Sequence, residues 1–66
     1  LMIKNINAIE FFIDYFNNYI TVQTIADHHG ISEDLAHYLI NLGRKLNNKE
    51  IFIEDIRDYS IRINYN

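Results

Sequence analysis

The hydrophobic residues between positions 33 and 46 recur at steps of three and four, which places them along one face of a helix. The leucines of this series are Leu35, Leu39, Leu42 and Leu46. Beside Ile40, the small residues Ala36 and Gly43 extend the same face at positions where a neighbour can approach closely. Ser32, directly before the series, is typical of a helix start, because its hydroxyl accepts a hydrogen bond from a first-turn N–H group. The pattern predicts a helix over about residues 33–46.

A shorter amphipathic segment precedes this helix, and Gly30 separates the two. Ile25 and Ala26 are its inward positions, and Thr21 stands where a capping side chain is expected. Gly30 ends the segment, because glycine adopts the left-handed backbone conformation without the steric penalty that a Cβ atom brings. The sequence therefore predicts a helix over about residues 22–29 and a tight corner at Gly30, with Ile31 filling the corner.

Another helix is predicted from about Asn7 to Asn18, and hydrophobic residues cover more than half of its circumference. Asn7 and Glu10 have the spacing of a capping box. One stripe, which we expect to face the core, contains Ile6, Ile9, Ile13, Phe16 and Ile20, widened by Phe12 and Tyr19. Phe11 and Tyr15 lie outside that stripe. Either these two rings are covered inside the domain by the C-terminal segment, or they form a dimer or partner interface, where aromatic residues are enriched.

Two further segments have the β-branched and aromatic composition of strands. Tyr19 to Val22 follows the first helix, and Ser60 to Tyr65 alternates between polar and hydrophobic residues. A polar turn at residues 54–59 precedes the second segment, so the sequence predicts a C-terminal β-hairpin over about residues 50–65. A helix fits the spacing of this region nearly as well, on the positions Phe52, Ile56, Tyr59 and Ile63.

The composition indicates one small domain. The 66 residues include no cysteine, so neither a disulfide nor a thiolate metal ligand is available. No hydrophobic run approaches the roughly 18 residues of a membrane span, and we expect no membrane association and a cytoplasmic location. The net charge of −3 argues against strong nucleic-acid binding, because phosphate contacts need cations. Most of the six basic residues nevertheless fall in or after the helix predicted at 33–46.

The order of elements and the glycine corner resemble a winged helix-turn-helix domain. The resemblance is carried by residues 20–22 as a first strand and by six residues at the spacing that such motifs use for their corner: Ile25, Ala26, Gly30, Ile31, Ala36 and Leu39. The expected fold class is α+β, mainly α: a single domain over residues 1–66 with a three-helix helix-turn-helix core and a C-terminal hairpin. His29 stands where the family usually has an apolar side chain, so we expect it to be partly buried with its ring nitrogens bonded.

The resemblance implies a small DNA-binding transcriptional regulator of phage, plasmid or bacterial type. The helix at 33–46 would lie in the major groove of double-stranded DNA, and a homodimer is expected because one recognition helix contacts only a few base pairs. The residues implied near base edges are Ser32, His37, Tyr38 and Asn41, of which the Asn41 amide suits adenine. The residues implied at phosphates are Arg44, Lys45 and Lys49, with Arg57 reaching DNA from the hairpin tip.

A second hypothesis is that the chain has the same fold but does not bind DNA. It would then be a protein-interaction module, such as an inhibitor or accessory factor of the kind that phages encode. The net acidity, the surplus aromatic residues of the first helix, and Glu33 and Asp34 at the start of the predicted recognition helix favour it. We expect no metal or cofactor, because His28 and His29 diverge on one helix and His37 lies on the next. We also expect no enzymatic activity, since so short a chain has little room for a water-excluding cleft.

Overall fold

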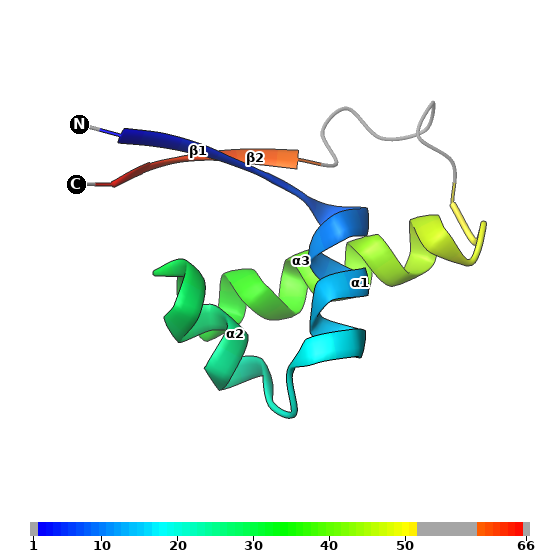
Figure 1. The fold of residues 1–66 in the computed structure, drawn as a ribbon. Coiled ribbons are helices and arrows are strands. Elements are labelled where there is room, and N and C mark those ends of the chain that lie inside the picture. The colour runs from blue at the N-terminus through cyan, green and yellow to red at the C-terminus, as the bar shows by residue number, and fades with distance from the viewer. Residues whose placement is uncertain (1, 52–59, 66) are drawn as a thin grey trace.

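Three helices make up most of the described chain, and a strand lies near each end (Figure 1). A computed structural model describes residues 2–51 and 60–65, and for residues 2–4 and 60–65 it describes the backbone alone. The elements in chain order are β1 (Met2–Asn7), α1 (Ala8–Asn18), α2 (Val22–His29), α3 (Glu33–Asn47) and β2 (Ser60–Tyr65). In Figure 1, α1 descends from the end of β1 and crosses α3, and α2 lies at the N-terminal end of α3. The fold is therefore mainly helical.

The two strands pair with each other although they are far apart in the sequence. They are antiparallel, and the register runs from Met2 opposite Tyr65 to Asn7 opposite Ser60. The two ends of the chain consequently lie side by side (Figure 1). The sequence pattern does not predict β1, whereas the strand predicted at Ser60–Tyr65 agrees with β2. The rest of the predicted hairpin includes residues 52–59, which lie outside the described residues.

Side chains cap the starts of all three helices, as the sequence predicts. The side-chain oxygen of Asn7 accepts hydrogen bonds from two backbone N–H groups of the first turn of α1, at 2.9 and 3.2 Å. The hydroxyl groups of Thr21 and Ser32 each accept from the N–H group three residues further on, at 3.2 and 3.1 Å. The bounds predicted for the second and third helices are confirmed to within one residue. The first helix begins at Ala8 because Asn7 is its cap.

The short strand predicted at Tyr19 to Val22 is wrong. Tyr19 to Thr21 form the loop between α1 and α2, and Val22 is the first residue of α2. The Thr21 backbone is extended because its side chain caps α2, so this β-like stretch serves as a helix start. The Tyr19 hydroxyl hydrogen-bonds with Nδ1 of His28, which attaches the loop to α2.

The corner between α2 and α3 depends on Gly30. Its backbone is left-handed, with φ 69° and ψ 34°. The Gly30 N–H group donates to the carbonyl of Asp27 at 3.2 Å, and the Ile31 N–H group donates to the carbonyl of Ala26 at 3.0 Å. This pair of hydrogen bonds is a Schellman motif, which terminates a helix. The predicted conformation of Gly30 is confirmed, and Ile31 packs partly buried against the core.

The face of α1 that enters the core differs from the predicted one. Phe11 is 3% exposed and Ala8 is fully buried, whereas Phe16 is 76% exposed and Ile13 is 41% exposed. The stripe expected to face the core is therefore wrong at Ile13 and Phe16, whereas Phe12 and Tyr19, which widen it, pack partly buried against the core. Ile6, its first member, is buried, but it belongs to β1.

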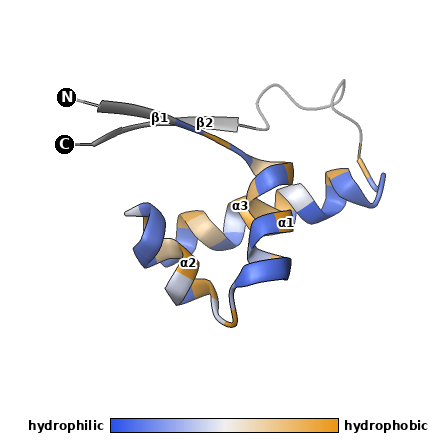
Figure 2. Ribbon diagram, in the orientation of Figure 1, coloured by the Kyte–Doolittle hydropathy of each residue, from blue (hydrophilic) through white to orange (hydrophobic). Residues whose placement is uncertain are grey.

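The core lies where the three helices meet. Ile25 of α2 and Leu39 of α3 are completely buried. Figure 2 shows hydrophobic residues on α1 and α3 where the two helices cross, and also in the loop between α1 and α2. The buried cluster comprises Ile6, Ala8, Phe11, Ile25, Ala26, Ala36, Leu39 and Ile40.

The backbones of α1 and α3 come into direct contact at Gly43. A Cβ atom at this position would lie 2.0 Å from the carbonyl oxygen of Ala8 and 2.8 Å from Cβ of Phe12. Carbon atoms in favourable contact are about 3.5–4.0 Å apart, so only glycine permits this crossing. Ala8 and Phe12 are one turn apart on α1. The contact therefore also determines which side of α1 faces α3.

We predict that Gly43→Ala destabilises the domain, although alanine is the better helix former by about 1 kcal/mol. The backbone of Ala8 cannot retreat without separating the helices, so we expect the free energy of unfolding to fall by about 3 kcal/mol. Urea denaturation followed by circular dichroism measures it. Gly30→Ala is the control, because nothing lies within 4 Å of the added Cβ and only left-handed strain of about 1–2 kcal/mol is expected. A Gly43→Ala variant more stable than the unsubstituted protein would contradict the crossing.

Candidate nucleic-acid interface

One face of α3 is exposed along its length. Asp34, Tyr38, Asn41 and Lys45 are separated by four, three and four residues, which places them on the same side of the helix. All four are exposed, Tyr38 to 55%, and His37 is exposed beside them. We call these five residues the α3 ridge. The predicted outward orientation of the three uncharged ones, His37, Tyr38 and Asn41, is confirmed by their exposure.

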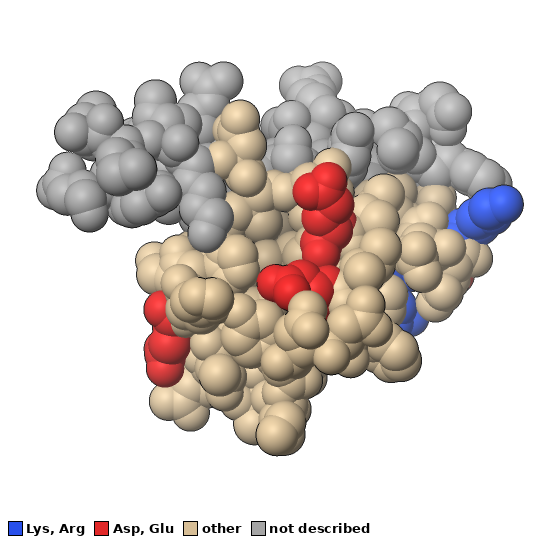
Figure 3. Space-filling view, in the orientation of Figure 1, with Lys and Arg blue, Asp and Glu red and all other residues tan. Residues whose placement is uncertain are grey.

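Charge changes sign along α3. Glu33 and Asp34 lie in its first turn, and Arg44 and Lys45 lie in its last. In Figure 3 the basic side chains are seen at the C-terminal end of α3, whereas acidic side chains lie over α1 and α2. Acids near a helix N-terminus and bases near its C-terminus both stabilise the helix through its dipole. The arrangement therefore stabilises α3 and at the same time concentrates the cations of this region at one end.

Ser32 lies directly before α3, and its side chain forms a hydrogen bond within the chain. Its hydroxyl accepts the hydrogen bond from the Leu35 N–H group that caps the helix. A hydroxyl in that position keeps its own hydrogen available to donate. The primary role that the geometry gives Ser32 is thus to begin α3, beside Glu33.

The turn that ends α3 holds Lys49 in a conformation that favours glycine. Its φ is 61°, and its side chain is exposed. The Lys49 N–H group donates to the carbonyl of Leu46 at 3.2 Å, and the Glu50 N–H group donates to the carbonyl of Lys45 at 2.9 Å. Lys49 therefore occupies the same position in this turn that Gly30 occupies at the end of α2. A left-handed residue other than glycine stores strain, and such strain tends to occur at functional positions.

Arg44 forms an ion pair with Glu50, which follows the end of α3. Its Nη1 atom lies 3.3 Å from Oε2 of Glu50, and the two side chains are 42% and 50% exposed. An exposed ion pair of this kind contributes at most about 1 kcal/mol. Arg44 is therefore able to exchange Glu50 for a phosphate. Lys45 and Lys49 are exposed to solvent on the same end of the helix.

A hollow of about 170 Å³ adjoins the α3 ridge, and it is lined by Tyr38, Asn41, Leu42, Lys45 and Ile51. An aromatic ring, an amide and an ammonium group are suited respectively to stacking on a base, hydrogen bonding to a base edge and neutralising a phosphate. Sequence reasoning identified three of these residues but missed Leu42 and Ile51, because their apolar side chains indicate only packing. Arg57, the remaining predicted DNA contact, lies outside the described residues.

The two aromatic residues considered for a partner interface turn toward the core. Phe11 is 3% exposed, and its ring centroid lies 5.1 Å from that of His29. Tyr15 is half-buried against the core cluster. Phe11 therefore lies inside the domain and offers no surface to a partner, whereas the half-buried Tyr15 remains partly accessible.

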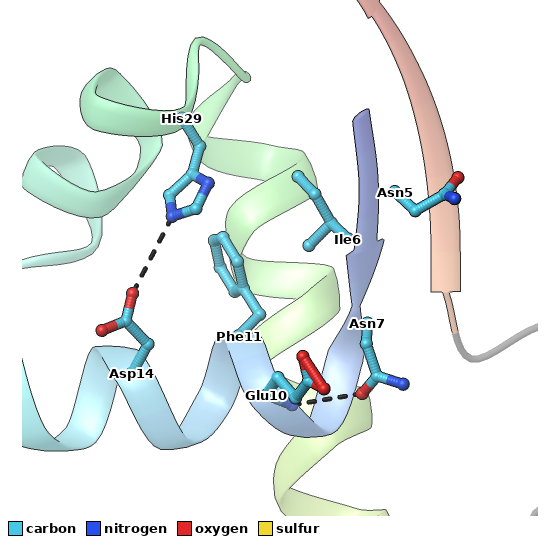
Figure 4. A pocket seen from close by; sticks show the side chains of 7 residues that line it. All are labelled: Asn5, Ile6, Asn7, Glu10, Phe11, Asp14 and His29. Carbon is cyan, nitrogen blue, oxygen red and sulfur yellow. Dashed lines mark hydrogen bonds and ion pairs between the residues drawn. The ribbon is translucent and has the colours of Figure 1, made fainter. Parts of the chain in front are cut away.

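A second hollow, of about 270 Å³, lies between β1, α1 and the end of α2 (Figure 4). Phe11 and Ile6 contribute its apolar wall, and Oδ2 of Asp14 lies 3.9 Å from Nε2 of His29. The His29 side chain is 19% exposed, so the expected partial burial is confirmed. The lining offers carboxylates, an imidazole and amides but no hydroxyl, thiol or amine nucleophile. We assign the Asp14–His29 contact a structural role, since it joins α1 to the end of α2.

Comparison with protein-family models, with curated proteins and with solved structures finds no match. Within the described residues, no three His, Cys, Asp or Glu side chains are grouped so as to hold a metal ion. None of the described helices has the length and apolar character needed to cross a membrane. The case for any function of this chain therefore depends on its residues and their geometry.

We predict that Ser32→Ala lowers the free energy of unfolding by about 1 kcal/mol, because α3 loses its cap. Ser32→Asp should retain the stability of the unsubstituted protein, since aspartate caps as well as serine. Chemical denaturation compares the three proteins. Equal stability of Ser32→Ala and the unsubstituted protein would show that the hydroxyl does not cap α3.

Lys49→Gly should have the opposite effect and raise the free energy of unfolding by up to about 1 kcal/mol, because glycine adopts φ 61° without strain. Lys45→Gly is the matched control: it removes the same charge from the interior of α3, where glycine lowers stability by about 1 kcal/mol. Thermal and urea unfolding of both variants measure the difference. If both lost stability equally, Lys49 would not be strained.

Proposed function

We propose that this protein binds double-stranded DNA through α3 and acts as a small transcriptional regulator without enzymatic activity. The observation that carries the proposal is the α3 ridge, where uncharged hydrogen-bonding side chains in the middle of an exposed helix precede cations at its end. An exposed helix of this kind is what the major groove admits. The supporting feature is the corner at Gly30, because it sets α2 against one end of α3 and leaves the ridge uncovered.

Each group on the ridge has a chemical role in this proposal. The Asn41 amide donates and accepts in the plane of one base edge, which is the bidentate geometry that adenine offers. His37 and Tyr38 lie within a turn of Asn41 and supply further hydrogen bonds or apolar contact with a thymine methyl group. Lys45, Lys49 and Arg44 contact phosphates and set the orientation of α3 on the duplex.

The charge of the chain limits the affinity. Three cations at the end of α3 support at most about three phosphate contacts, and each contributes roughly −0.9 to the slope of log K against log salt concentration. We therefore expect a slope of about −2 to −3 and micromolar or weaker non-specific binding. Glu33 and Asp34 oppose the approach of the first turn to the duplex, unless one of them accepts a hydrogen bond from a cytosine amine.

A second function is a protein-interaction module with the same helical corner. Two observations favour it: the acidic first turn of α3, and the exposure of Phe16 and Ile13 on α1. In that case the hollow beside Tyr38, which Lys45 lines, would receive an apolar or acidic side chain of a protein partner instead of a nucleotide.

We predict that Asp34→Asn strengthens binding to random-sequence duplex DNA several-fold at low salt, because it removes a like charge from the ridge. Glu10→Gln is the matched control. It makes the same change in net charge and removes an acid from the first turn of α1, which lies off the ridge. In the opposite direction, Lys45→Gln should weaken binding to all sequences and reduce the salt slope by about 1. Fluorescence anisotropy of labelled duplexes over a salt series measures all three.

Equal effects of Asp34→Asn and Glu10→Gln would show that only net charge matters and that α3 does not face the duplex. The absence of binding at any salt concentration would exclude the DNA proposal and favour the protein-interaction module. Binding that is tight and depends steeply on salt would contradict the three-phosphate estimate and require cations beyond the end of α3.

A further inference from the structure

The side of α1 that faces away from the core is also hydrophobic. Phe16 is 76% exposed and Ile13 is 41% exposed, and the Phe12 ring, half-buried, lies 6.2 Å from the Phe16 ring. We call Ile13 and Phe16 the α1 outer face; Phe12, next to them in the groove, packs partly buried against the core. The crossing at Gly43 commits Ala8, Phe11 and Phe12 to the interior, and Ile13 and Phe16 lie outside that contact.

The α1 outer face forms one wall of a groove of about 330 Å³. The end of α3 forms the other wall, with Asn47 and Asn48, and Asn17 lies at the edge on α1. A large aromatic side chain that is three-quarters exposed beside other apolar groups loses favourable burial, and monomeric proteins rarely leave such patches uncovered. The groove therefore has the character of a docking surface.

The charge pattern indicates which partner fits this groove. The described residues that line it carry no charge, although the chain as a whole has a net charge of −3. An acidic or basic partner would gain nothing from a neutral groove, and a basic one would be drawn instead to the side of α1 that carries Glu10 and Asp14. Two copies of an acidic chain, in contrast, approach with least repulsion where neither bears charge.

The asparagine side chains at the edge of the groove can form hydrogen bonds with the asparagine side chains of a second copy of the chain. In a two-fold symmetric interface the same patch is used by both subunits, so residue i contacts residue j and residue j contacts residue i. An asparagine side chain carries both a donor and an acceptor, and it pairs with another asparagine in either orientation. Asn17 on one copy and Asn47 or Asn48 on the other meet this requirement.

We propose that a second copy of this chain docks on the α1 outer face, with the two α1 helices packed across a two-fold axis and Phe16 at the centre of the interface. The groove is lined by six described residues, far fewer than the roughly 20–30 residues per side of a standard interface, so we expect the dimer to be weak and reversible, in the micromolar range. The proposal does not depend on DNA binding, and its test contains no DNA.

Phe16→Lys is the first test, measured by sedimentation equilibrium from micromolar to millimolar protein concentration. The unsubstituted protein should show a concentration-dependent dimer, and Phe16→Lys should remain monomeric because like charges then face each other across the axis. A lysine near the C-terminus of α1, which has no basic residue in its last turn, should leave the fold intact. Ile20→Lys is the matched control: it adds the same charge at a hydrophobic residue that is 94% exposed outside the groove lining, and it should dimerise normally.

Introduced cysteines give an independent readout, because the natural chain contains none. Ile13→Cys, which leaves Phe16 in place, should form a disulfide-linked dimer under mild oxidation faster than Ile20→Cys, since residues of the proposed interface approach their own copies. Equal rates for the two variants would reflect random collision and overturn the proposal.

Two other results would overturn it as well. A protein that is monomeric at every concentration, with Phe16→Lys as stable as the unsubstituted chain, would leave the groove for a different protein. A monomer that loses stability on Phe16→Lys would show that the α1 outer face is covered within the chain itself.

Discussion

The contact between the backbones of α1 and α3 at Gly43 is the constraint on which the rest of the arrangement depends. There is no room for a Cβ atom between the Gly43 α-carbon and the Ala8 carbonyl. Two helices that approach this closely bring their neighbouring side chains into register, and the buried Phe11 and Leu39 lie on the facing sides. A small domain has a single core with few residues, so its stability depends strongly on how closely those residues pack.

The same contact determines what the molecule presents to its surroundings. Because the side of α3 that contains Gly43 and Leu39 is turned inward, Tyr38 and Asn41 are turned outward. On α1, Ala8 and Phe11 are buried, whereas Ile13 and Phe16 lie outside the contact with α3 and remain exposed. The hydrogen-bonding ridge lies on α3, and the hydrophobic groove lies between α1 and the C-terminal end of α3. The proposed DNA contact and the proposed contact with a second copy therefore use different surfaces.

Local hydrogen bonds, in contrast, account for the ends of the helices. The Gly30 turn and the Lys49 turn have the same pattern of backbone bonds, yet only the first contains glycine. Glycine at position 30 removes strain from the corner that orients α3. Lysine at position 49 retains strain and places a cation beside Lys45, at the end where a phosphate would be bound. The difference between the two turns is consistent with a structural role for the first and a binding role for the second.

The sequence by itself determined the features whose physical causes lie within a few residues. Capping side chains at Asn7, Thr21 and Ser32 mark the helix starts, and Gly30 marks an end, because each acts on backbone groups at most four residues away. The outward position of Asn41 also followed, since the leucine series of α3 left only one side polar. The predicted strand at residues 19–22 failed because a β-like composition and an extended cap residue have the same local signal.

Only the tertiary structure decided which side of α1 is buried and which strand pairs with which. Hydrophobic residues cover more than half of α1, so periodicity favoured a stripe in which Ile13 and Phe16 prove to be exposed. The choice of buried side depends on the fit of Ala8 against Gly43, which is 35 residues away in the chain. The pairing of Met2–Asn7 with Ser60–Tyr65 joins opposite ends of the sequence, and no local pattern encodes such a partner. Side-chain periodicity describes one element at a time, whereas burial and strand pairing are properties of two elements in contact.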